Sequence, residues 1–375
     1  MPTRVCSYSK INLGLAIGPV RADGFHGLAT LYQTLALHDV VTVTVYKPTS
    51  QKPDVGHLDL WQSKITLTTN HPEVPTDARN TAWKMVELAL TRMGVSAEVA
   101  IHIEKNLPVQ GGLGAGSANA AAALIGLERE LGVTLPEVER MEIAAEVGSD
   151  VPLFMLGGAV MGKGRGECVS AMPDLPATPC VIAIPEVGVS TPQAFCDWDH
   201  RQTKGIGDEE RDSLTSPTQP DRLEQLSHVY ASVLGACPAT EQTPDTSGIV
   251  RGSAESDTRD DLAEKTLLAL VRTGIENDFE SVVFPQYPLL REIKRLLMGT
   301  PAGVSSGAFS EARPGDSSGN ALYAALSGSG SAMFGLYRSE ADARAAQQRV
   351  QATGCKAILT ETLPRQEYWR RMFAE

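Results

Sequence analysis

A glycine-rich segment between an expected strand and an expected helix constrains this chain most. Residues 106–119 read Asn-Leu-Pro-Val-Gln-Gly-Gly-Leu-Gly-Ala-Gly-Ser-Ala-Asn. Residues 99–103 before it have the pattern of a strand, and apolar residues spaced by three and four after it predict a helix with one buried face. Glycines let backbone N–H groups approach an anion, and a helix N-terminus adds donors and positive charge. Residues 111–117 therefore form either a phosphate-binding loop or a glycine-rich turn capped by Ser117.

Hydrophobic periodicity places the other elements. Strands are expected at 5–17, 40–46, within 58–69, at 160–169, 181–184, 332–337 and 357–361, and helices at 80–93, 135–147, 262–271, 287–298 and 340–352. Polar residues and proline dominate 198–261, and Gly, Ser and Pro dominate 300–320, which predicts two flexible inserts. We expect a domain boundary near residue 180, between an N-terminal domain at 1–180 and a C-terminal domain at 181–375.

Composition excludes several classes of protein. With 375 residues, 42% hydrophobic and 21% charged, the chain can bury the cores of two domains and is not globally disordered. A net charge of −12 argues against binding nucleic acid or an anionic membrane, but it permits a small anionic ligand. Six cysteines without a C-x-x-C pair predict a reduced cytoplasmic protein. We expect no signal peptide and no membrane span, since the longest apolar stretch, 151–161, is short.

Two charged residues beside apolar runs are candidates for chemistry. Asp150 precedes Val-Pro-Leu-Phe, where a carboxylate can serve as a general base, although on its own a turn or capping aspartate is the simpler interpretation. Lys10 lies in an apolar strand, either as an edge residue that reaches water or as a buried cation that needs a partner. A Lys–Asp pair beside an anion-binding loop would be a minimal phosphoryl-transfer site. Residues 157–163 match G-x-x-x-x-G-K, but Gly164 follows where a P-loop needs Ser or Thr, so we expect a turn between strands there.

Four motifs occur in the order typical of the GHMP kinases. The first is Ser9-Lys10-Ile11-Asn12-Leu13 with Asp23-Gly24-Phe25-His26-Gly27-Leu28, and the second runs from Leu107-Pro108 to Asn119-Ala120-Ala121. The third is Gly148-Ser149-Asp150-Val151-Pro152 followed by Gly157-Gly158 and Gly164-Arg165-Gly166-Glu167, and the fourth is Ser327-Gly328-Ser329-Gly330. The chain resembles this family over most of its length outside the inserts. The resemblance implies a two-domain α+β fold, with an N-terminal nucleotide-binding domain and a smaller C-terminal sheet-and-helix domain. It also implies transfer of the γ-phosphoryl group of ATP, with Mg²⁺, to a small alcohol held between them.

The resemblance also implies roles for single residues. Asp150 would be the general base, and Lys10 would hold that carboxylate and the developing charge. The nucleotide would contact Asn80, Lys105, Pro108, Gly111, Gly112, Leu113, Gly114, Ala115, Gly116 and Ser117. The acceptor would contact Asn12, Phe25, His26, Thr191, Phe195 and Gly330. In that set His26 would read a cytosine edge, and the two phenylalanines would either stack on the cytosine ring or pack in the core.

His26 with its aromatic neighbour favours a cytidine-bearing acceptor. The resemblance points to 4-diphosphocytidyl-2-C-methyl-D-erythritol, phosphorylated at its 2-hydroxyl in non-mevalonate isoprenoid synthesis. Two alternatives stay open: a GHMP kinase for a different small alcohol, and a nucleotide-binding relative that transfers no phosphate. Ala118, which replaces the second serine of a usual Ser-Ser pair near the magnesium, and the inserts suggest the second alternative, while Lys10 and Asp150 count against it. Phe25 replaces a tyrosine, which keeps the ring and removes the hydroxyl.

Overall fold

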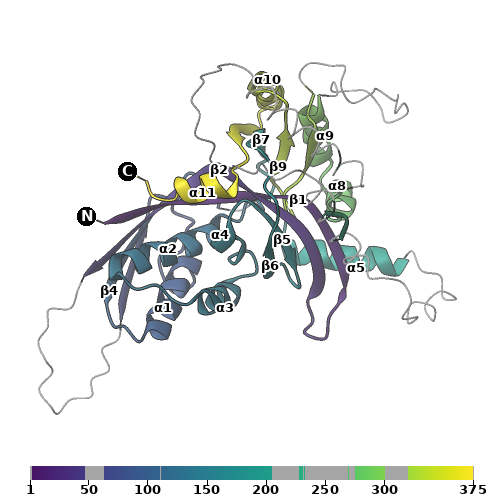
Figure 1. Ribbon diagram of the computed structural model, residues 1–375. Coiled ribbons are helices and arrows are strands. Elements are labelled where there is room, and N and C mark those ends of the chain that lie inside the picture. The colour runs from purple at the N-terminus through teal and green to yellow at the C-terminus, as the bar shows by residue number, and fades with distance from the viewer. Residues whose placement is uncertain are drawn as a thin grey trace, which may run out of the picture.

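The computed structural model describes residues 2–46, 63–109, 111–204, 228–230, 232, 269, 275–299 and 320–374. These residues form two sheets with helices packed against them, which is the α+β class expected (Figure 1). The helix expected at 262–271 and most of both expected inserts lie outside the described residues. Within the described part of the chain, no helix is both long enough and apolar enough to cross a bilayer.

The first sheet is built on a long antiparallel pair, β1 (Thr3–Val20) and β2 (His26–Tyr46). Its order is β3 (Lys64–Thr69), β4 (Glu98–Glu104), β2, β5 (Ala159–Lys163) and β6 (Cys168–Ala171), with β1 also on β2. The helices α1 (Thr81–Met93), α2 (Ala115–Leu131), α3 (Glu137–Val147) and α4 (Leu153–Leu156) belong to the same unit (Figure 1). Small residues let α2 lie close to the strands, because a Cβ atom built on Gly126 would lie only 2.7 Å from Val43 Cγ2.

The second sheet is antiparallel and has the order β10 (Lys356–Glu361), β7 (Pro179–Ile184), β9 (Met333–Leu336) and β8 (Tyr323–Leu326). With it are α5 (Thr191–Lys204), α8 (Glu280–Gln286), α9 (Pro288–Met298) and α10 (Glu340–Gln351). The chain passes from the first sheet to the second between β6 and β7. This crossing lies beside residue 180, and the division into two domains there stays a prediction.

Local signals in the sequence explain where elements begin and end. Helix α1 is capped by Asn80, whose side chain accepts the Ala82 N–H at 2.9 Å, and it ends at Gly94 in the left-handed region. The segment 157–163 is a turn followed by β5, as expected. The first insert is expected from near residue 198, and helix α5 continues past that point to Lys204. Trp198 lies one turn after Ala194, and both are buried against the second sheet. The insert itself stays a prediction.

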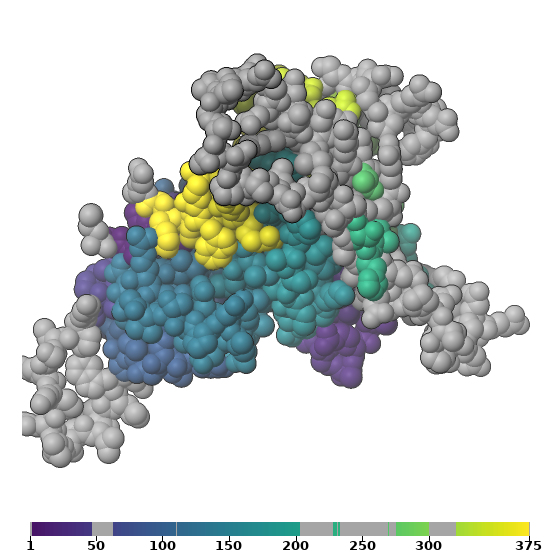
Figure 2. Space-filling view, in the orientation of Figure 1, coloured from purple at the N-terminus to yellow at the C-terminus, as the bar shows by residue number. Residues whose placement is uncertain are grey.

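The final helix, α11 (Arg365–Arg370), is an element that the sequence did not reveal. It returns to the first sheet, and Figure 2 shows it in yellow against the helices of that unit. The side chain of Tyr368 is 2% exposed, and its hydroxyl donates to the Phe154 carbonyl at 2.7 Å. A Cβ atom on Gly157 would lie 2.4 Å from the Tyr368 ring, so glycine at that turn makes room for the tyrosine. The C-terminus therefore stabilises the N-terminal core.

We predict that Tyr368→Ala lowers the free energy of unfolding by roughly 3–5 kcal/mol, because it removes a buried aromatic ring and leaves a cavity. Urea unfolding followed by circular dichroism measures the change. Arg370→Ala is the matched control on the same helix, since the Arg370 side chain is 64% exposed and paired with Glu367. Equal effects of the two substitutions would contradict the docking of α11 described here.

Candidate active site

The glycine-rich loop is a backbone surface that leads into α2. Gly111, Gly112 and Gly114 have φ of 128°, 78° and 69°, a region that residues with a side chain rarely adopt. Gly114 precedes the helix and carries no side chain to cap it. The N–H groups of the first turn of α2 can therefore donate hydrogen bonds to a bound anion. This geometry fits the phosphate cradle expected from the sequence.

A second glycine loop, at residues 327–331, supports the first. Ser327 Oγ donates to the Gly112 carbonyl at 2.9 Å, and the Ala332 N–H donates to the Gly111 carbonyl at 3.1 Å. A Cβ atom on Gly112 would lie 2.0 Å from the Ser327 carbonyl oxygen, so the two backbones touch. The loops border a cavity of about 590 Å³ whose other walls come from the start of α5. It is lined by Gly111, Gly112, Gly188, Val189, Ser190, Thr191, Pro192, Ser329 and Gly330.

Lys10 and Asp150 meet beside the first loop. Lys10 Nζ lies 3.3 Å from Asp150 Oδ2 and 2.7 Å from Asn12 Oδ1. The Lys10 side chain is 4% exposed and that of Asp150 is 31% exposed. Of the two interpretations of Lys10, the structure therefore selects a buried cation with a partner. A Cβ atom on Gly114 would lie 3.0 Å from Lys10 Cγ, so this glycine leaves room for the lysine stem.

Tyr32 and Thr30 complete the site, and sequence reasoning missed both. The Tyr32 hydroxyl donates to Asp150 Oδ1 at 3.0 Å. Burial, and then the Asp150 carboxylate, raise the pKa of Tyr32 well above its ordinary value, so the phenol stays a neutral donor. Thr30 Oγ1 accepts from Asn12 Nδ2 and donates to the Gly14 carbonyl, each at 2.8 Å. No pattern in the sequence singles out either residue, because the same stretch of strand also holds the polar residues Gln33 and Thr34.

The residues expected to read a base are packed on one another. The rings of His26 and Phe195 stack with centroids 5.0 Å apart and planes 7° apart. His26 Nδ1 lies 2.9 Å from the Gly18 carbonyl, and Nε2 lies 3.2 Å from Asp199 Oδ1. Phe25 is 54% exposed. The structure therefore brings His26 and Phe195 together with both imidazole nitrogens engaged by the protein, and leaves Phe25 as the open ring.

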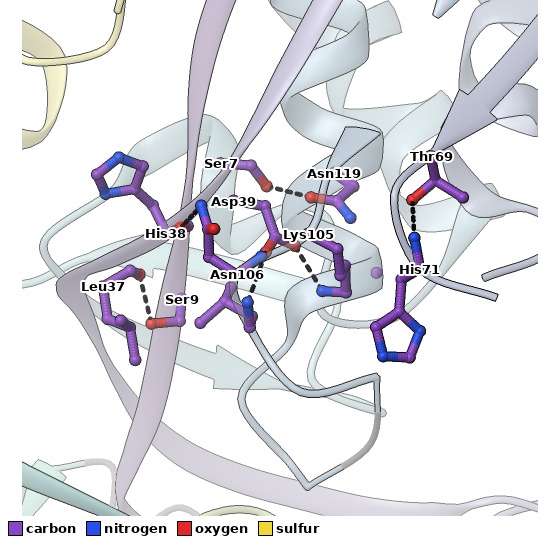
Figure 3. A network of polar contacts seen from close by, with 12 residues as sticks. Ser7, Ser9, Leu37, His38, Asp39, Thr69, His71, Lys105, Asn106 and Asn119 are labelled. Atoms are coloured by element: carbon purple, nitrogen blue, oxygen red, sulfur yellow. Dashed lines mark hydrogen bonds and ion pairs between the residues drawn. The ribbon is translucent and has the colours of Figure 1, made fainter. Parts of the chain in front are cut away.

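Lys105 supports the loop from within the protein. Its ammonium lies 2.5 Å from Asp39 Oδ2, and the two side chains are 3% and 0% exposed. Asp39 Oδ1 also accepts the N–H groups of Asn106 and Leu107 at 2.7 Å each. Figure 3 shows Asp39 between Lys105 and Asn106. Asp39 thus holds the segment that leads into the glycine loop, and the Lys105 ammonium balances its charge. The expected contact of Lys105 with a nucleotide stays a prediction, as does that of Asn80, whose amide caps α1 and donates to the Pro75 carbonyl.

The other expected nucleotide residues surround or support the loop. A Cβ atom on Gly111 would lie 4.0 Å from Pro108 Cγ, and the Gly116 carbonyl accepts from Thr81 Oγ1 at 2.6 Å. Leu113 and Ala115 are buried. Ser117 is the half-buried hydroxyl of the first helical turn, near Gly148.

Ala118 faces the interior. It is 2% exposed and belongs to the first core, so a hydroxyl at this position would lie among apolar side chains. Within the described ranges no three His, Cys, Asp or Glu side chains cluster as metal ligands.

Known proteins share these features. The family profile described as GHMP kinases N terminal domain matches residues 80–158, and that described as GHMP kinases C terminal matches 315–355. A relative from Solibacter usitatus named 4-diphosphocytidyl-2-C-methyl-D-erythritol kinase is 30% identical and covers 98% of this chain and 92% of its own. A relative of the same name from Synechococcus sp. is 32% identical over 88% of this chain and 84% of its own. The chain belongs to this family of GHMP kinases.

Solved structures share the fold. A 4-(cytidine 5'-diphospho)-2C-methyl-D-erythritol kinase superposes with a TM-score of 0.59 at 23% identity, covering 96% of this chain and 98% of its own. A homoserine kinase from Cytophaga hutchinsonii gives 0.62 at 16% identity, covering 97% and 95%. The GHMP kinase fold expected from the motifs is thus confirmed.

We predict that Gly112→Ala weakens nucleotide binding at least tenfold, because the methyl group displaces the Ser327 backbone. Gly132→Ala is the matched control: Gly132 has φ 67°, and a Cβ atom there meets nothing within 4 Å. Both variants carry the left-handed strain of about 1–2 kcal/mol, and only Gly112→Ala also disturbs the loop. Titration with an ATP analogue and thermal unfolding separate the two effects. Equal nucleotide affinity in both variants would contradict the cradle.

Proposed function

We propose that this chain transfers the γ-phosphoryl group of ATP to the 2-hydroxyl of 4-diphosphocytidyl-2-C-methyl-D-erythritol, a step of non-mevalonate isoprenoid precursor synthesis. The observation that carries the proposal is the Lys10–Asp150 pair beside the glycine loop. It occurs in a chain whose relatives of this name match almost its whole length.

Asp150 has the surroundings of a general base. Lys10 contacts one carboxylate oxygen and Tyr32 donates to the other, so the carboxylate is held in one orientation. Its partial exposure leaves access for the acceptor hydroxyl, from which it takes the proton as that oxygen attacks phosphorus. The Lys10 charge stabilises the negative charge that develops on the reacting oxygens. Catalysis then consists of positioning and charge stabilisation.

The glycine loop and the N-terminus of α2 would hold the ATP phosphates. The residues fit this group, because Gly111, Gly112 and Gly114 present bare backbone and the N-terminus of α2 has no side-chain cap on its N–H groups. Mg²⁺ would be held by those phosphates and by the hydroxyl of Ser117 in the first turn of α2. When bound, the ion supplies charge neutralisation on the phosphates. Ala118 leaves this arrangement intact because it faces the core.

The setting of this activity follows from the sequence. We place the protein in the cytoplasm on the basis of its scattered cysteines. We assign residues 1–180 and 181–375 to two domains that enclose ATP and acceptor. Thr191 and Gly330 line the cavity shared with the glycine loop, which supports their placement beside the substrates.

An alcohol without a nucleobase is the second candidate acceptor. It is favoured by the packing of His26 on Phe195, which leaves neither imidazole nitrogen without a protein contact. A base that is read by His26 would have to replace the Asp199 contact.

An ADP-release assay with magnesium ATP separates the candidates. The acceptors are 4-diphosphocytidyl-2-C-methyl-D-erythritol, mevalonate and homoserine, each over the same concentration range. We expect turnover only with the cytidine compound. Turnover with another alcohol would overturn the acceptor and keep the kinase chemistry, and ATP binding without turnover on any acceptor would favour the non-catalytic alternative.

We predict that Asp150→Asn lowers kcat by about 100-fold or more, the contribution typical of a general base, while the affinity for ATP stays within about twofold. The amide keeps the shape of the side chain and cannot take the proton. Glu142→Gln is the matched control, an equivalent change in an exposed ion pair with Arg92. Near-normal turnover of Asp150→Asn would remove Asp150 from this role.

A further inference from the structure

We propose that Arg165 binds the diphosphate of the acceptor, an inference that rests on the function proposed above. Arg165 lies in the turn between β5 and β6, and no role has so far been given to its side chain. The acceptor carries two phosphates between its alcohol and its base, and in a chain of net charge −12 a local cation favours their binding.

Strand pairing places Arg165 along β2. Gly162 is paired with Thr30, and the Leu28 N–H donates to the Gly164 carbonyl at 2.7 Å. A Cβ atom on Gly166 would lie 2.5 Å from the Tyr32 hydroxyl oxygen. The turn therefore lies beside residues 28–32 of β2, with Arg165 between its two glycines.

The same stretch of β2 joins the two ends of the proposed acceptor site. Tyr32 donates to Asp150 at the reacting end, and His26 and Phe25 mark the end expected to hold the base. Six residues of strand span about 20 Å. An extended acceptor with its alcohol at Asp150 and its cytosine near Phe25 therefore has its diphosphate alongside the Arg165 turn.

The Arg165 side chain is suited to a phosphate ligand. Its guanidinium lies over the Phe25 ring, with Cζ 5.0 Å from the centroid, and the side chain as a whole is 35% exposed. Glu167 holds the turn, since its Oε2 accepts the Arg165 main-chain N–H at 2.5 Å and its Oε1 lies 3.6 Å from Arg165 Nε. That second distance is an ion-pair contact, longer than a hydrogen bond. A planar guanidinium can donate two parallel hydrogen bonds to phosphate oxygens.

Binding of acceptor fragments tests the role directly. CDP and cytidine are titrated into the wild-type enzyme and into Arg165→Gln, Arg165→Lys and Arg92→Gln, with a non-hydrolysable ATP analogue saturating the nucleotide site. Arg92 is an arginine of the surface ion pair with Glu142 and controls for loss of charge. We expect Arg165→Gln to weaken CDP about tenfold and cytidine less than twofold. Arg165→Lys should recover part of the CDP affinity, and Arg92→Gln should match the wild type.

Steady-state kinetics give a second readout. Arg165→Gln should raise KM for the complete acceptor about tenfold and leave KM for ATP unchanged. Equal weakening of CDP and cytidine would overturn the proposal and assign Arg165 to the stacking of Phe25. Unchanged CDP affinity in Arg165→Gln, with normal wild-type turnover, would overturn this inference alone. A wild-type enzyme that neither binds CDP nor turns over the acceptor would overturn it together with the proposed function.

Discussion

A buried ammonium group has to be paired, and the Lys10 ammonium organises this site. An uncompensated charge at that depth would cost several kcal/mol or more. Its partners come from different parts of the chain: Asn12 from β1, and Asp150 from the turn after α3. Satisfying Lys10 therefore fixes that turn against the β1–β2 pair. The Asp150 side chain remains 31% exposed, which leaves room for a hydroxyl to reach it.

The C-terminal part of the chain supports the phosphate-binding loop through the second glycine loop, residues 327–331. Asn277 Nδ2 donates to the carbonyls of Leu326 and Gly328 at 2.8 and 2.7 Å, and Asp278 Oδ2 accepts the Ile17 N–H of β1 at 2.8 Å. The loop fixed in this way is the one whose backbone touches Gly112. Residues more than 200 positions apart thus form one wall of the site. The close approach of the two backbones therefore explains the glycines in loops 111–117 and 327–331 as well as phosphate binding does.

Features that depend on neighbouring residues in the sequence could be predicted, and features that depend on distant residues could not. Asn80 and Gly94 bound α1 through short-range hydrogen bonds and a left-handed residue, so its ends could be read from the sequence. Helix α11 could not be, because six residues carry little periodicity and its position depends on Tyr368 filling the space beside Gly157. The two interpretations of Lys10 differ only in whether the tertiary structure buries the side chain. The sequence motif could therefore identify Lys10 as a site residue, but only the fold shows that its ammonium is buried and paired. Tyr32 reads as an ordinary strand residue until Asp150 is placed against it.

The two ends of the proposed acceptor site differ in how easily they can rearrange. The reacting end is built around the buried side chains of Lys10 and Tyr32, and removing their partner Asp150 leaves a charge and a donor unsatisfied. At the other end Phe25 and Asp199 are 54% and 49% exposed, beside the buried His26. A ligand that takes the place of Asp199 there displaces a carboxylate already at the surface, whereas one that displaced Asp150 would leave the buried Lys10 ammonium without its counter-charge. Such a site adjusts to its acceptor at the base end while the geometry of phosphoryl transfer stays constant.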